Sequence, residues 1–183
     1  AYGEVILGSN ELRHGIIHCQ ITDIPLLERF AKLDVLAYVQ PIFLHYDLHI
    51  VEDRVGKPLA STSYAFQTME KLGLHTAYGT DSPVEGFNVF HCILCALNRQ
   101  DLSLFPEGGF YPQERVDLAT AIDRYTLGGA YTSFDENKKG RLYEGYLADL
   151  VVLDRSLFDL DPTQIKDVEV EMTMVDGRIV YQR

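Results

Sequence analysis

The sequence predicts an α/β fold in which a parallel sheet is followed by a short antiparallel β element. Three short apolar segments, at residues 12–19, 35–39 and 75–79, alternate with segments of helical periodicity. Strands that alternate with helices are typical of βαβ crossovers and therefore of parallel pairing. Near the end of the chain, Asp176-Gly177 separates two strand-like segments and predicts a hairpin turn between antiparallel strands.

Two helices follow the first and second predicted strands, and their ends can be recognised. Thr22 or Asp23 can cap the first helix, and Pro25 would lie in its first turn. The second helix is expected over residues 62–72 and stops at Gly73, a typical helix terminator. The first two strands are thus each followed by the helix that a parallel crossover requires.

The second half of the chain predicts further helices and then the antiparallel ending. Helices are expected over residues 88–98 and 114–130, separated by a loop rich in glycine and proline at residues 103–112. A strand is expected over residues 148–154. Residues 168–174 alternate between apolar and polar side chains, so one face of that strand is expected to be buried and the other solvated.

Composition and charge exclude several classes of partner. The 183 residues are 46% hydrophobic and 23% charged, and the formal net charge is −11. A surface of that sign repels nucleic-acid phosphates and anionic membranes, so we expect neither as a partner. No apolar run approaches the ~20 residues that cross a bilayer, and residues 1–8 lack the pattern of a signal peptide. Three cysteines, an odd number, indicate a reducing, cytoplasmic compartment.

Polar side chains lie at or just beyond the ends of the three predicted parallel strands. His18 ends the first strand, Gln40 ends the second and Asp81 follows the third. Because such folds bind ligands at the carboxyl ends of their strands, these groups should converge on one edge, with Gln40 as a candidate substrate contact. Alone, His18 would be interpreted as a core histidine and Asp81 as a helix cap. Together they predict a metal site, since zinc accepts both ligand types.

Two other motifs carry weaker signals. His45 and His49 are four residues apart and would share a helix face, but Tyr46 stands where the zinc-protease signature requires a glutamate. We expect a loop or helix start here, with His45 as a second candidate substrate contact. Cys92 and Cys95 lie in the middle of an apolar helix, which favours core packing over redox chemistry.

Several segments, in the order in which they occur, carry a resemblance to a known family. Residues 13–20, Val39-Gln40-Pro41 and residues 78–84 look like the last three barrel strands of the amidohydrolase superfamily of metal-dependent hydrolases. Residues 140–154 and 173–181 are similar to its final segment and closing hairpin. The branch that these motifs resemble contains N-substituted formamide deformylase.

The resemblance implies a fold and a reaction. Residues 1–135 would be the last three strand-helix units of a TIM-type (β/α)8 barrel, and residues 136–183 would be strands of a small antiparallel β-sandwich. His18 would be the metal ligand at the end of barrel strand six. Asp81 would be the strand-eight aspartate, which binds metal and is the catalytic general base. A metal-activated water would attack a small-molecule amide or formamide and break its C–N bond.

The resemblance also implies a divalent metal cofactor, with one or two ions in the full-length protein. Zinc is the expected ion, although iron or manganese accept the same ligands. The family's His-x-His pair and its remaining strands do not occur in this sequence. We therefore expect the chain to be the C-terminal fragment of a longer enzyme, inactive by itself. Its open sheet would expose unpaired edges, which favours a homo-oligomer or other association through those edges.

Two interpretations compete with the enzyme. Gly15 and Ile17 replace the Arg and Glu that are usual in the branch, so a non-catalytic regulator that retained the barrel is one alternative. A complete small α/β binding module is the other, against which the unpaired final hairpin and the missing strands argue. An upstream His-x-His pair would favour the enzyme. A closed, monomeric fold without an exposed edge would favour the binding module.

Overall fold

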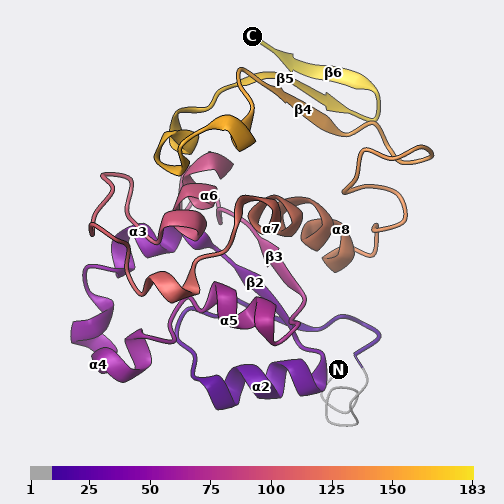
Figure 1. The fold of residues 1–183 in the computed structure, drawn as a ribbon. Coiled ribbons are helices and arrows are strands. Elements are labelled where there is room, and N and C mark those ends of the chain that lie inside the picture. Colours follow the sequence, from indigo (N-terminus) through magenta and orange to yellow (C-terminus); the bar gives the residue numbers. More distant parts are fainter. Residues whose placement is uncertain (1–9) are drawn as a thin grey trace.

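The computed structural model, which describes residues 10–183, contains two separate three-stranded sheets (Figure 1). The first sheet is parallel and has the order β1-β2-β3, with strands at Gly15–Ile17, Leu36–Val39 and Thr76–Tyr78. The second sheet is antiparallel and has the order β4-β5-β6, with strands at Leu150–Leu153, Val170–Val175 and Arg178–Gln182. The predicted α/β class with an antiparallel ending is confirmed.

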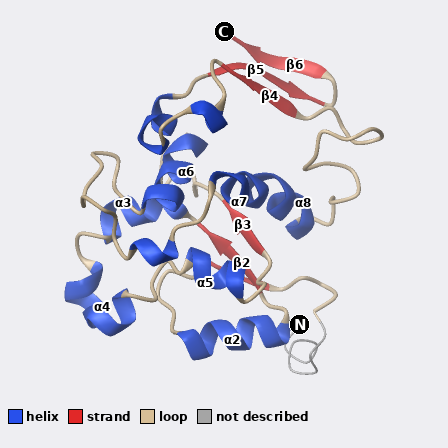
Figure 2. Ribbon diagram, viewed as in Figure 1, coloured by secondary structure: helices blue, strands red, loops and turns tan. Residues whose placement is uncertain are grey.

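Helices surround the parallel sheet, while the antiparallel sheet stands apart at the top of the view (Figure 2). The α-helices are α2 (Ile24–Leu33), α3 (Leu44–Asp47), α4 (Val51–Ala60), α5 (Phe66–Lys71), α6 (Val89–Asn98), α7 (Leu118–Asp123) and α8 (Gly129–Thr132). Shorter helical turns are η1 (Pro41–Phe43), η2 (Pro112–Glu114), the π-helical η3 (Arg124–Gly128), η4 (Leu157–Asp159) and η5 (Pro162–Asp167). Within residues 10–183, no helix has the length and apolar character needed to cross a membrane.

One main cluster of buried side chains joins elements from both halves of the chain. Leu27 of α2, Val39 of β2, Phe66 of α5, Phe90 of α6 and Ile165 of η5 all belong to it. The segment after residue 135 therefore contributes to the same core as the parallel sheet. The predicted division into residues 1–135 and 136–183 remains a prediction, and residues 1–9, which include the segment without a signal-peptide pattern, lie outside the described part.

Local chemistry explains the helix and hairpin ends that were predicted. The side chain of Asp23 accepts a hydrogen bond from the backbone N–H of Leu26 at 2.8 Å, so Asp23 is the cap of α2. Thr22, the alternative cap, instead donates through Oγ1 to the carbonyl oxygen of Thr62 at 2.8 Å. The predicted hairpin is confirmed, because Asp176 and Gly177 have φ angles of 48° and 73° between β5 and β6, as a type I′ turn requires.

The predicted helix over residues 114–130 is shorter and less regular than expected. It begins only at Leu118, because Asp117 has extended backbone and caps the first turn of α7 with its side chain. Residues 124–128 are then wound as a π-helix before α8 completes the run. The apolar spacing predicted the presence of this helix, but neither its start nor its change of pitch.

Two boundaries between β2 and β3 also differ from the prediction. The helix expected over residues 62–72 begins at Phe66, and it is preceded by α4, for which no helix was predicted. Gly56, at φ 76°, interrupts α4, and Pro58 lies inside it. These two helix breakers conceal the helical periodicity of the segment.

Burial of the strands is as expected for the centre of the parallel sheet but not for its edge. Ile16 and Ile17 of β1 are 50% and 63% exposed, whereas the apolar run at residues 16–19 predicts a buried strand. β1 pairs with β2 on one side only, so its side chains have fewer neighbours than those of β2. Residues 170–174 of β5 are half-buried throughout rather than alternately, which differs from the predicted alternation.

Glycine at position 128 sets how closely the helical run approaches β3. A Cβ atom at Gly128 would lie 2.3 Å from the carbonyl oxygen of Thr76, a backbone atom that cannot move aside without moving the strand. The π-helical turn at this point packs directly against β3. Close approach of a helix to a sheet is one of the reasons for which a glycine is required inside a helix.

We predict that Gly128→Ala lowers the free energy of unfolding by about 1–3 kcal/mol, because the added methyl group overpacks the contact with Thr76. Gly129→Ala is the matched control, since a Cβ atom at that helical position meets no atom within 4 Å. It should leave stability unchanged or raise it by about 1 kcal/mol through helix propensity. Urea unfolding of both variants measures the difference, and equal effects would contradict the packing role of Gly128.

Candidate metal centre

The carboxyl ends of the three parallel strands lie along one edge of the sheet. Ile17 pairs with Tyr38, and Val39 pairs with Tyr78, so the strands end nearly level with one another. We call the residues that leave these strands, 18–20, 40–47 and 79–84, the carboxyl edge. His18, Gln40 and Asp81 all belong to it. β1 and β3 are separated by one strand, which corresponds to roughly 10 Å between their axes.

His18 leaves β1 with its imidazole held by the neighbouring strand. Its backbone N–H donates to the carbonyl oxygen of Tyr38 at 2.7 Å, and its Nδ1 lies 2.8 Å from Oε1 of Gln40. An amide oxygen can only accept, so this contact favours the tautomer with the proton on Nδ1, in which Nε2 has the lone pair. A hydrogen bond on one ring nitrogen is the usual support for a histidine that binds metal through the other.

Gln40 is 8% exposed, and its side-chain oxygen is occupied by the contact with Nδ1 of His18. Its amide Nε2 lies 3.5 Å from the carbonyl oxygen of Tyr38, on the same strand, so both ends of the amide face protein groups. Sequence reasoning selected Gln40 as a substrate contact. In the folded chain its side chain contacts the imidazole of His18. A substrate contact by Gln40 remains a prediction.

Asp81 is exposed and its carboxylate is available for a cation. It opens the turn after β3, where the backbone N–H of Val84 donates to its carbonyl oxygen at 2.8 Å. Among residues 10–183, no group donates a hydrogen bond to the carboxylate, so Asp81 does not cap a helix as the structural alternative required. The N-terminal cap of α6 is Asn88.

The donor chemistry fits a divalent metal, but two donors do not complete a site. An imidazole nitrogen and a carboxylate oxygen are both common zinc ligands, and a catalytic zinc usually has three protein ligands and a water. Within the described part of the chain, no group of three or more His, Cys, Asp or Glu side chains is placed to hold a metal ion. His18 and Asp81 would therefore form part of a ligand set.

His45, in α3, and His49, two residues beyond the end of α3, both contact a neighbouring loop. Nδ1 of His45 accepts a hydrogen bond from the backbone N–H of Leu102 at 3.1 Å. Nε2 of His49 lies 3.0 Å from Asp101, and its ring stacks on Phe105. These contacts explain both histidines as supports for residues 101–105. A substrate contact by His45 remains a prediction.

The structure also explains the two cysteines of α6 and one of the two positions of β1 at which this chain differs from the resembled branch. Cys92 and Cys95 are buried in α6, as expected for core packing. A Cβ atom at Gly15 would lie 2.3 Å from the ring of Tyr38, so this backbone does not accommodate the arginine that is usual in the resembled branch. Ile17, the second departure, has its side chain at the exposed edge of the sheet.

Sequence reasoning did not single out three residues beside His18. Gln20, Asp47 and Tyr64 form a hydrogen-bonded group next to the turn that carries the imidazole. Gln20 lies within the motif at residues 13–20, which was the only local signal. Asp47 and Tyr64 come from other segments, so no spacing rule could have connected them.

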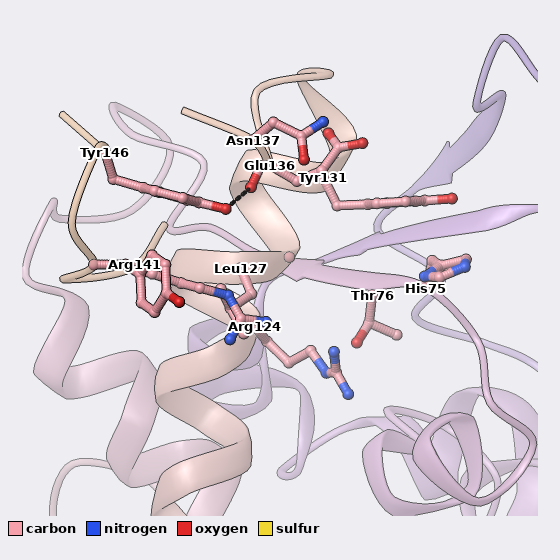
Figure 3. Close-up of a pocket in the computed structure, with 11 residues that line it drawn as sticks. His75, Thr76, Arg124, Leu127, Tyr131, Glu136, Asn137, Arg141 and Tyr146 are labelled. Carbon is pink, nitrogen blue, oxygen red and sulfur yellow. Dashed lines mark hydrogen bonds between the residues drawn. The ribbon is translucent and has the colours of Figure 1, made fainter. Parts of the chain in front are cut away.

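A pocket of about 640 Å³ lies at the opposite, amino-terminal end of β3 (Figure 3). It is lined by Thr76, the first residue of β3, and by Arg124 and Glu136 among others. The charges of these two side chains are already compensated, since Nε of Arg124 donates to Glu70 at 2.7 Å and Nη1 of Arg13 donates to Glu136 at 2.8 Å. The pocket is thus separate from the carboxyl edge, and the charges of Arg124 and Glu136 are engaged in these ion pairs.

Comparisons with known proteins address the family of this chain. The family model described as the amidohydrolase family matches residues 6–181. The Bacillus subtilis protein YtcJ, whose name places it among the amidohydrolases, is 33% identical over 168 residues, which are 92% of this chain and 32% of that protein. N-substituted formamide deformylase of Arthrobacter pascens is 26% identical over 120 residues, which are 66% of this chain and 22% of the enzyme.

A solved structure extends the likeness to three dimensions. An uncharacterized metal-dependent hydrolase from Pyrococcus horikoshii aligns with a TM-score of 0.72 and 26% identity, over 87% of this chain and 32% of that one. The chain thus spans a third or less of the length of these three relatives. Because the family model covers nearly all of its residues, the chain belongs to the amidohydrolase family.

Proposed function

We propose that this chain contributes part of the metal centre of a hydrolase that breaks a carbon–nitrogen bond in a small-molecule amide or formamide. One observation carries the proposal: parallel pairing brings the backbone of His18 and of Asp81 to the same edge of the sheet. Membership of the amidohydrolase family supports it, as does the likeness to a formamide deformylase.

His18 and Asp81 have distinct roles in this proposal. A divalent metal, when bound, lowers the pKa of water to about 7 and polarises the substrate carbonyl. His18 offers Nε2 as a neutral ligand, oriented by Gln40. Asp81 offers its carboxylate both as a ligand and as the base that takes the proton of the attacking water. The same carboxylate then returns that proton to the leaving nitrogen, which departs as a neutral amine.

Zinc is the metal that we propose, because imidazole and carboxylate are its usual catalytic ligands, with iron and manganese as alternatives. The remaining ligands would lie outside residues 10–183, which agrees with the short span of the chain relative to its relatives. In this proposal β1, β2 and β3 are the last three strands of a (β/α)8 barrel. β4, β5 and β6 belong to a small β-sandwich.

The proposal extends to the partners and the cellular location of the protein. A small-molecule substrate, no nucleic-acid or membrane partner and a cytoplasmic location agree with the acidic composition and the reduced cysteines. The exposed edge strand β1 favours association with further strands or with another copy. A non-catalytic regulator drew support from the departures at Gly15 and Ile17, and packing against Tyr38 now accounts for the first of these.

We predict that His18→Ala and Asp81→Asn, in the full-length protein, each lower the bound metal and kcat/KM by about 100-fold or more, because each removes a metal ligand. Metal analysis after dialysis and an amide-hydrolysis assay measure both effects. His75→Ala and Asp34→Asn are matched controls, since these side chains lie 3.7 Å apart beside the amino-terminal ends of β3 and β2. Unchanged metal content in both ligand variants would refute the site.

Gln40→Leu separates a positioning role from substrate binding. We predict a loss of metal affinity of about 10-fold, because Nδ1 of His18 loses its acceptor, with KM unchanged once metal is saturating. Gln40→Glu keeps an acceptor oxygen and should retain affinity. The measurements are chelator competition and steady-state kinetics. A raised KM with normal metal affinity would instead assign Gln40 to substrate binding.

The 183-residue chain by itself should neither bind zinc tightly nor hydrolyse amides, because the described residues supply only two donors. Titration calorimetry with zinc and an assay with a formamide substrate test this on the purified chain. The full-length protein is the positive control. Turnover by the purified chain in the presence of zinc would show that its metal site is complete without further ligands.

A further inference from the structure

The turn that carries His18 has an unfavourable backbone conformation. His18 and Cys19 are consecutive residues with φ angles of 74° and 48°, in the left-handed region. Neither is a glycine, so the Cβ of each opposes this conformation. Backbone of this kind persists only where the surrounding contacts hold it, and such contacts gather at functional sites.

The strand side of the turn is held by the parallel sheet. The backbone N–H of His18 donates to Tyr38 at 2.7 Å, and the backbone N–H of Cys19 donates to the carbonyl oxygen of Ile17 at 3.1 Å. The thiol of Cys19 lies 3.2 Å from the carbonyl oxygen of Ile16. These bonds orient the start of the turn but leave its far side, at Gln20, to be held by other groups.

A closed group of three side chains holds the far side. Nε2 of Gln20 donates to the hydroxyl of Tyr64 at 2.9 Å and lies 3.3 Å from Oδ2 of Asp47. The hydroxyl of Tyr64 donates to the same Oδ2. The backbone N–H of Tyr64 also donates to the carbonyl oxygen of Gln20 at 2.9 Å. Both the backbone and the side chain of Gln20 are thus attached to Tyr64.

Tyr64 is itself firmly anchored. It is 2% exposed, and its carbonyl oxygen accepts a hydrogen bond from Nη1 of the fully buried Arg99 at 2.5 Å. Burial, and then the neighbouring Asp47, raise the pKa of Tyr64 well above its usual range, so its hydroxyl remains a donor. Asp47 lies in α3, on the segment that begins at Gln40. The group therefore links the exits of β1 and β2.

We propose that Gln20, Asp47 and Tyr64 are positioning residues for His18. They hold the left-handed turn at His18 and Cys19, from which the imidazole reaches Gln40, and so direct Nε2 to the carboxyl edge. The inference rests on the proposed function in one respect, namely that His18 binds the metal. A group that served stability alone would leave metal affinity unchanged when it is removed.

The experiment compares two tyrosine substitutions in the full-length protein. Tyr64→Phe removes the hydroxyl that joins Gln20 to Asp47, and zinc affinity, measured by chelator competition, should fall about 10-fold. Tyr78→Phe is the matched control, because the Tyr78 hydroxyl is also buried and has no hydrogen-bond partner within residues 10–183. It should leave zinc affinity unchanged. Asp47→Ala should lose affinity as Tyr64→Phe does, and Asp47→Asn, which keeps an acceptor oxygen, should recover most of it.

His18→Ala in the same assay distinguishes a failure of the proposed function from a failure of the positioning role. If His18→Ala leaves zinc affinity intact, the proposed function fails. If His18→Ala abolishes affinity while Tyr64→Phe and Asp47→Ala match the Tyr78→Phe control, the positioning role is overturned. Affinities are compared well below the unfolding midpoint of each variant, and a lowered midpoint with unchanged affinity also overturns it. Gln20→Leu, at a half-buried position, tests the same link should Tyr64→Phe not fold.

Discussion

The two parallel ladders of the first sheet determine where this chain can do chemistry. Ile17 faces Tyr38 and Val39 faces Tyr78, so the exits of three strands meet at one edge. A shift of one residue in the ladder between β1 and β2 would turn every side chain of the shifted strand to the other face. His18 and Gln40 would then no longer meet. The short Nδ1–Oε1 contact between them depends on this register.

The imidazole of His18 is held at this edge by a left-handed backbone conformation, which is unfavourable for residues with a Cβ atom. The chain maintains this conformation with long-range hydrogen bonds rather than with glycine. Gln20 is joined to Tyr64, forty-four positions later, and Tyr64 is joined to Arg99, a further thirty-five positions along. Arg99 itself donates to Phe110 and so closes the loop after α6. The candidate metal centre is thus connected to the buried core by a continuous series of hydrogen bonds.

The same sheet is open at its sides. Ile16 and Ile17 are exposed on β1, and the antiparallel sheet carries exposed Val151, Ile179 and Val180. Apolar strands with unpaired edges are a general site of association with further strands. The chain matches only about a third of the length of its relatives. The open sheet and the absence of a third candidate metal donor both concern contacts that residues 10–183 do not supply.

The sequence alone determined the features that depend on neighbouring residues. Alternating strands and helices, the Asp23 cap and the Asp176-Gly177 turn result from local hydrogen bonding and backbone preference, so short patterns predict them. The tertiary structure decided the exposure of β1, the π-helical approach at Gly128 and the commitment of buried Gln40 to His18. It also assembled Gln20, Asp47 and Tyr64. These features depend on which distant segments pack together, and a one-dimensional pattern does not contain that information.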